Sequence, residues 1–179
     1  MAFMFFFTFF VQDTPWLSEK SLPFLFASIL TIFIITFIGF IDDLLMVKAE
    51  GRGGGLTQWQ KPLLTLTAAI PLMVVNAGTS KLIVPFYGHV DFGLFYPLLF
   101  IPLGVIGAAN MVNIFAGLNG LESGLGLIYL GSLGSYAYVH EHYLAAIIAL
   151  ITFAALIPYH IYNKYPAKIL PGDSLTYFL

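Results

Sequence analysis

The sequence has no cysteine, and only 9% of its 179 residues are charged. The absence of cysteine excludes disulfides, thiolate metal ligands and thiol nucleophiles. The scarcity of charge and a formal net charge of −2 leave no basic field that could hold nucleic acid. No fixed-period repeat is visible, and no linker rich in proline, glycine or serine divides the chain. We therefore expect a single domain, residues 1–179, that does not bind nucleic acid.

Apolar residues are abundant instead. Hydrophobic residues make up 59% of the chain and aromatic residues 17%, and the mean hydropathy is +0.91. A helix needs roughly 20 mostly apolar residues to cross the hydrocarbon core of a bilayer. The runs that approach this length are residues 22–41, 62–77, 94–112, 120–139 and 143–162. The sequence predicts an all-α polytopic membrane protein with about five full transmembrane helices.

The two ends and one loop depart from this pattern. The opening MAFMFFFTFFV is too short to span a bilayer and lacks the basic leader of a signal peptide, and the closing LTYFL is turning apolar again. We expect partial spans there, in a chain truncated at both ends. Between the second and third runs, SKLIVPFYGHVDFG alternates in part, which predicts a short extracytoplasmic hairpin with its turn at Tyr87-Gly88-His89.

Basic residues in short loops predict the orientation of the helices. With five alternating spans, one side collects five basic residues and the other side two. The first set is Lys48, Arg52, Lys61, Lys164 and Lys168, and the second is Lys20 and Lys81. The richer side is therefore predicted to be cytoplasmic.

Two adjacent carboxylates, Asp42 and Asp43, follow the first apolar run directly. The C-terminal end of a helix carries partial negative charge from unpaired carbonyl groups, so two acids there need a compensating cation. The alternative interpretation is a pair of solvated loop acids just outside the bilayer.

Four more polar residues lie in NMVNIFAGLNGLESG, where the third span ends and the fourth begins. They are Asn110, Asn113, Asn119 and Glu122, and the alternation of spans places them on the same side of the membrane as Asp42. The glycines between them allow a tight turn or close approach to a ligand. The alternative is helix packing, since asparagine and glycine commonly join transmembrane helices.

A third polar segment, NKYPAKILPGDS, follows the fifth span and carries Asp173. Its prolines stop regular helix. Three turns on one side of the membrane thus offer carboxylate and amide oxygens, which are the ligands of a hard cation such as Mg²⁺. Because Mg²⁺ keeps positions open for phosphate oxygens, the pattern predicts a phosphorylated substrate at the membrane edge.

FIGFIDDLLM, NMVNIFAGLNGLESG and YPAKILPGDS, in this order, resemble the polyprenyl-phosphate N-acetylhexosamine-1-phosphate transferase superfamily, glycosyltransferase family 4. The branch most similar is the dolichyl-phosphate one. The resemblance implies transfer of GlcNAc-1-phosphate from UDP-GlcNAc to a polyprenyl phosphate, which yields polyprenyl-diphospho-GlcNAc and UMP. It also implies Mg²⁺ as cofactor, with Mn²⁺ as an alternative ion, and it leaves a homodimer open.

The resemblance further implies roles for individual residues. Asn113 and Asp173 match the metal ligands, Asn119 the amide that contacts uracil, and Lys61 a lysine near the phosphates. Asp42 and Asp43 match the paired catalytic aspartates, with Asp42 expected on the acceptor side and Asp43 as support for the metal. Asn110 and Glu122 belong to the same motif and are assigned to substrate binding. Two positions depart from the pattern: Met46 replaces a third acid, and Leu170 replaces an aromatic residue that stacks on uracil.

The expected location is a multi-pass integral membrane protein with its site on the cytoplasmic face, in a plasma membrane or an endoplasmic reticulum membrane. Two other functions remain open. A transporter also places acids and amides in a membrane, but usually near the midplane rather than at one edge. A remnant of the enzyme that binds a partner without turnover would keep the motifs.

Overall fold

The protein is described by a computed structural model that covers residues 21–49 and 54–179, and these residues form mostly α-helices. The helices α2 (Leu22–Lys48), α3 (Gln60–Val74), α4 (Ile101–Phe115), α5 (Leu121–Val139) and α6 (Tyr143–Asn163) correspond to the five expected runs. A π-helical turn, η1 (Tyr96–Phe100), leads directly into α4. The all-α, polytopic membrane class expected from the sequence is confirmed. The partial spans expected in residues 1–20 lie outside the described residues.

Among the described residues, three helices are long and apolar enough to cross a membrane. They are Leu22–Lys48, Tyr96–Phe115 and Tyr143–Asn163. The helix α3 has 15 residues, which at 1.5 Å per residue reach about 22 Å, short of the ~30 Å hydrocarbon core. The helix α5 has 19 residues, but glycine, serine and tyrosine lower its hydropathy. The count of five full spans therefore stays a prediction.

The hairpin expected between the second and third runs is present as two antiparallel strands, β1 (Lys81–Val84) and β2 (Gly88–Asp91). Its extracytoplasmic location stays a prediction. The expected turn at Tyr87-Gly88-His89 is wrong, because Gly88 pairs with Val84 and the turn is residues 85–87. Pro85 has no N–H to continue the ladder. The Tyr87 N–H donates to the Val84 carbonyl at 3.1 Å, which closes the turn before the glycine.

The helices pack through small residues, and large apolar side chains face outward. Ala68, Ala69 and Ala109 are buried, whereas Phe33 and Ile128 are 65% and 68% exposed. Such small-residue interfaces with apolar outer surfaces are typical of helices in lipid, where apolar burial supplies little drive for association. This pattern agrees with the membrane class expected from the sequence.

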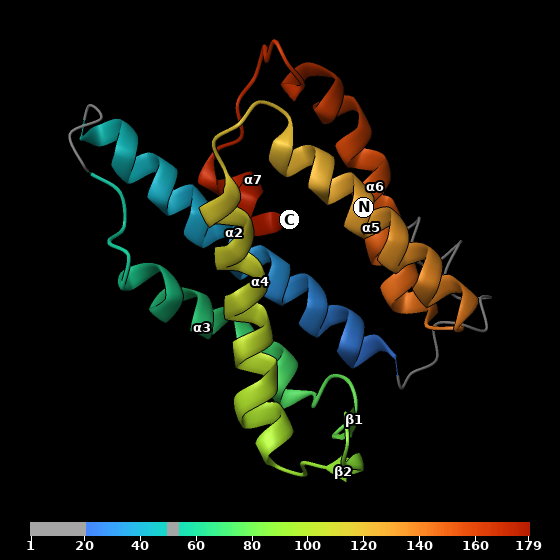
Figure 1. The fold of residues 1–179 in the computed structure, drawn as a ribbon. Helices are drawn as coiled ribbons and strands as arrows, with labels where there is room; N and C mark the ends of the chain where they lie inside the picture. Colours follow the sequence, from blue (N-terminus) through green and yellow to red (C-terminus); the bar gives the residue numbers. More distant parts are fainter. Residues whose placement is uncertain (1–20, 50–53) are drawn as a thin grey trace.

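A short helix that the sequence did not predict, α7 (Asp173–Phe178), completes the fold. It packs against α2 and α4, and its Tyr177 is buried with Ile35, Ala68 and Ala109. Figure 1 shows α7 beside the C-terminal half of α2, while α5 and α6 form an antiparallel pair along one side. The hairpin lies at the end of α4 opposite to the α4–α5 turn (Figure 1). The polar turns thus share one end of the helix assembly.

The orientation can be tested with single cysteines, since the chain has none of its own. Gln58 and Tyr87 are both exposed. Gln58 lies in the loop before α3, and Tyr87 lies in the turn of the hairpin that follows α3. In sealed vesicles, we expect a membrane-impermeant maleimide to label Gln58→Cys only from the cytoplasmic side and Tyr87→Cys only from the other, because of the basic-residue asymmetry. Labelling of both from one side would contradict the predicted topology.

The contact between α2 and α7 depends on a glycine. A Cβ at Gly39 would lie 2.4 Å from the carbonyl oxygen of Asp173 and 2.8 Å from the Cα of Ser174. Gly39→Ala should therefore push α7 away and destabilise the protein by roughly 1–3 kcal/mol, as overpacking does. Thermal melts in detergent measure the effect. Gly104→Ala is the matched control, because a Cβ there meets no atom within 4 Å, and equal melting of both variants would refute the close contact.

Candidate active site

The helix α2 continues to Lys48, so Asp42 and Asp43 lie inside it and not at its end as expected from the apolar run 22–41. The two side chains face different neighbours, since consecutive helical residues point in different directions. Asp42 is completely buried and faces α3. Its Oδ2 lies 2.6 Å from the Lys61 Nζ, and its Oδ1 accepts the Leu56 N–H at 2.5 Å. The cation that compensates this buried carboxylate is therefore Lys61. Gly55 leaves room for the contact, because a Cβ there would lie 2.6 Å from Asp42 Oδ1.

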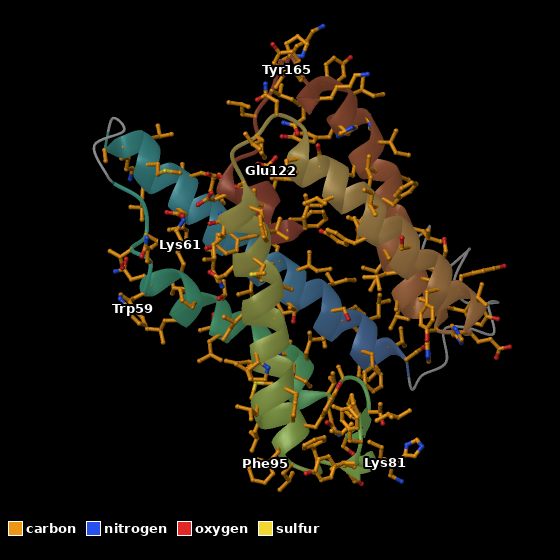
Figure 2. The ribbon with its side chains drawn as sticks, viewed as in Figure 1. Trp59, Lys61, Lys81, Phe95, Glu122 and Tyr165 are labelled. Atoms are coloured by element: carbon orange, nitrogen blue, oxygen red, sulfur yellow. The ribbon has the colours of Figure 1, made fainter. Side chains whose placement is uncertain are left out.

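Lys61 joins Asp42 to a carboxylate from the other end of the chain. Its Nζ donates to Asp173 Oδ2 at 2.9 Å, while Asn113 Nδ2 donates to Asp173 Oδ1 at 2.9 Å. Figure 2 labels Lys61 between α2 and α3. Asp42, Lys61, Asn113 and Asp173, each predicted from sequence as a site residue, thus converge from α2, α3, α4 and α7.

The electrostatics of the cluster follow from its charge count and its burial. Burial alone would lower the pKa of Lys61, but hydrogen bonds with Asp42 and Asp173 raise it above its ordinary value, so the ammonium stays charged at neutral pH. Burial and the neighbouring Asp42 carboxylate raise the pKa of Asp173, while Lys61 and Asn113 oppose that rise. The negative charge of Asp173 is thus only partly compensated by the protein.

Asp43 faces α7 rather than α3. Its Oδ1 accepts the Asp173 N–H at 2.7 Å, and its Oδ2 accepts the Ser174 N–H at 3.0 Å and the Ser174 hydroxyl at 2.6 Å. The N-terminus of α7 supplies the positive end that this second carboxylate requires. Asp43 therefore contacts the backbone of Asp173 and not the side chains that surround Lys61.

The remaining predicted residues lie in different surroundings. Asn110 Nδ2 donates to Thr65 Oγ1 at 3.1 Å and to the Ile106 carbonyl at 2.8 Å, contacts that favour helix packing. Glu122 is buried, and its Oε1 accepts the Gly117 N–H, which closes the α4–α5 turn. Asn119 is exposed and makes no hydrogen bond to any other described residue. Of these, Asn119 has its amide available for a ligand.

A buried polar network near the site was not predicted from the sequence. Ser123 Oγ lies 2.8 Å from His160 Nδ1 and donates to Asn163 Oδ1 at 2.7 Å. Asn163 Nδ2 donates to the Ile169 carbonyl at 3.0 Å. The network ties the start of α5 to the end of α6 and to the loop that leads to Asp173. Ser123 is 37 residues from His160 and 40 from Asn163 in sequence, so no local pattern indicates the network.

The charge and the donor atoms of the cluster bear on whether it could hold a divalent cation. Two carboxylates, Asp42 and Asp173, contact one ammonium, Lys61, and Asp43 lies on the backbone of Asp173, so the formal charge of the four groups is −2. Within the described residues, no group of three or more histidine, cysteine or acidic side chains forms a metal site, but Mg²⁺ needs few protein carboxylates. The nitrogen of the Asn113 amide faces Asp173, so joint coordination requires this amide to rotate.

A cavity of about 920 Å³ lies at the opposite end of the helices. Its lining includes Phe24, Gly78, Tyr136 and His142 and is mainly apolar. None of the acids of the cluster contributes to it. The cavity is thus separate from the candidate site.

Comparisons with known proteins show which family the chain belongs to. The sequence profile described as glycosyl transferase family 4 matches residues 25–179. A protein of Saccharolobus solfataricus with the provisional name UDP-N-acetylglucosamine–dolichyl-phosphate N-acetylglucosaminephosphotransferase is 37% identical over 90% of this chain and 47% of its own length. One of the same name from Sulfolobus acidocaldarius is 33% identical over 84% of this chain and 44% of its own.

A phospho-N-acetylmuramoyl-pentapeptide-transferase of Halalkalibacterium halodurans is also similar, with 35% identity over 76% of this chain and 43% of its own length. The chain spans about half the length of the curated relatives it matches. Since the family profile covers α2 through α7, the chain belongs to glycosyl transferase family 4.

Proposed function

We propose that this chain carries the site that transfers GlcNAc-1-phosphate from UDP-GlcNAc to a polyprenyl phosphate of the dolichyl type. The products are polyprenyl-diphospho-GlcNAc and UMP, in the first step of lipid-linked oligosaccharide assembly. One observation carries the proposal: Lys61, Asn113 and Asp173, distant in sequence, meet through 2.9 Å contacts beside the buried Asp42. The names of the two archaeal relatives support the choice of sugar and lipid.

The reaction breaks one phosphorus–oxygen bond and forms another. An oxygen of the acceptor phosphate attacks the β-phosphorus of UDP-GlcNAc, and the bond to the UMP oxygen breaks. A phosphate monoester has a second pKa of about 6, so most of the acceptor is already dianionic at neutral pH. Positioning and charge neutralisation are then the main requirements, as in other phosphoryl transfers.

The chain's own residues meet these requirements. Lys61 remains an ammonium and lies where it can attract phosphate oxygens. Asp173, with Asn113 after rotation of its amide, would hold Mg²⁺, or Mn²⁺ as an alternative. A bound divalent cation supplies Lewis-acid stabilisation of charge on the pyrophosphate. Asp42 holds Lys61 in place at 2.6 Å, and Asn119 is available for the uracil amide. We place this site on the cytoplasmic face of the membrane.

Asp173→Asn tests the proposal directly. The change removes the carboxylate charge but keeps the size of the side chain, so UMP release should fall by orders of magnitude while insertion into the membrane is preserved. The matched control is Asp91→Asn. Asp91 is exposed in the hairpin, which lies at the end of α4 opposite to the α4–α5 turn (Figure 1). Near-normal Mg²⁺-dependent release by Asp173→Asn would remove Asp173 from the site.

The unmodified chain distinguishes the enzyme from a remnant without turnover. We expect purified chain in detergent to release UMP when supplied with UDP-GlcNAc and polyprenyl phosphate, with one of the longer archaeal relatives as positive control. Release by the relative alone would favour the remnant.

Asn119→Ala tests the assignment of the nucleotide site. Loss of a hydrogen bond to uracil should weaken UMP and UDP-GlcNAc binding by roughly 1 to 3 kcal/mol and leave polyprenyl phosphate binding unchanged, because the lipid has no base. The melting temperature should not change, since Asn119 is exposed. Asn110→Ala is the comparison, because its contact with Thr65 predicts a lower melting temperature. Unchanged UMP affinity of Asn119→Ala in a binding titration would exclude the assignment.

A further inference from the structure

The N-terminus of α7 has no cap from its own sequence. Its N-cap residue is Gly172, which has no side chain, and no local side chain accepts the first N–H groups of the helix. The first N–H groups of a helix need acceptors from outside the helix. In α7 these groups belong to Asp173 and Ser174, so the acceptor that satisfies them also fixes the residue predicted to bind the metal.

Asp43 of α2 is that acceptor. It receives three hydrogen bonds, from the N–H groups of Asp173 and Ser174 and from the Ser174 hydroxyl, at 2.6 to 3.0 Å. A carboxylate oxygen has about two lone-pair sites, so the two bonds to Oδ2 occupy that oxygen. One site on Oδ1 remains. Asp43 thus has little capacity left to ligate a metal or to accept a proton from a substrate.

The surrounding backbone is shaped for this cap. A Cβ at Gly172 would lie 2.6 Å from Asp43 Oδ2, and a Cβ at Gly39 would collide with the carbonyl of Asp173. Gly39 and Asp43 are four residues apart, so they lie on one face of α2. That face of α2 receives the first turn of α7 at two points.

We propose that Asp43 and Ser174 form a positioning pair that fixes the Asp173 carboxylate beside Lys61 and Asn113. The pair acts on the site through the backbone of Asp173 and does not contact substrate or metal. The inference deepens the proposed function and rests on it for the role of Asp173. It replaces direct support of the metal as the role of Asp43, and it gives Ser174 a role that the motifs did not indicate.

The test measures metal affinity rather than turnover, with Mn²⁺ as a paramagnetic probe titrated into the purified 179-residue chain. Loss of groups that orient a metal ligand typically costs roughly 10- to 100-fold in metal affinity. We expect a loss in this range for Asp43→Asn and a smaller one for Ser174→Ala. Ser174→Thr should retain affinity because it keeps the hydroxyl. The double variant should bind Mn²⁺ no more weakly than Asp43→Asn, because both changes disrupt the same set of hydrogen bonds.

Ser28→Ala is the matched control, since the Ser28 hydroxyl only donates to the Phe24 carbonyl of its own helix at 2.8 Å. Its Mn²⁺ affinity should equal that of the unmodified chain. Additive losses in the double variant, or unchanged affinity in Ser174→Ala, would overturn the positioning pair. A lowered melting temperature with unchanged affinity would overturn it as well, because the cap would then be purely structural.

Failure of the proposed function has a different signature. An unmodified chain that binds no Mn²⁺ and releases no UMP would contradict the function itself. Deuterium exchange of the peptide that covers α7 then decides the inference. Faster exchange in both Asp43→Asn and Ser174→Ala, but not in Ser28→Ala, supports the pair, and unchanged exchange rejects it.

Discussion

Two adjacent carboxylates inside a membrane helix, held away from bulk water, need positive charge from outside that helix, and the arrangement of the site follows from this requirement. Asp42 obtains it from Lys61 of α3, and Asp43 obtains it from the N-terminus of α7. The first contact holds α3 against α2, and the second holds α7 against α2. Because Lys61 also contacts Asp173 of α7, both contacts belong to one cluster.

The glycines near the cluster allow close contacts with its aspartates. Gly55 and Gly172 each lie so close to an aspartate oxygen that a Cβ would come within 2.6 Å of it. Gly39 likewise allows the backbone of α7 to pack close to α2. In a helix assembly held by small residues, these positions are where the backbone can come near enough for a carboxylate to bond main-chain N–H groups. The packing of the fold and the geometry of the site therefore share the same residues.

The sequence predicted the helices and the convergence of the polar turns, because hydropathy sets the helices and alternation sets the side on which each turn lies. It did not predict which atoms pair. The role of Asp43 depends on α7, a six-residue helix too short to leave a periodic signal. The Ser123–His160–Asn163 network joins α5 to α6, and its hydrogen bonds depend on tertiary packing. The hairpin turn was misplaced because Gly88 was taken as the turn residue, whereas Pro85 ends the first strand.

The cluster is formed by described residues of this chain alone, although the chain spans about half the length of its relatives. Within it, Asp42 and Asp173 share Lys61, and Asn113 donates to Asp173. On the proposed function, an anionic substrate would compete with two carboxylates for Lys61, and a divalent cation would compete with Lys61 for Asp173. A cation held by Asp173 would weaken the contact between Asp173 and Lys61, which would leave more of the lysine's charge for phosphate oxygens. Metal and phosphate would thus favour each other's binding, since each relieves the charge that opposes the other.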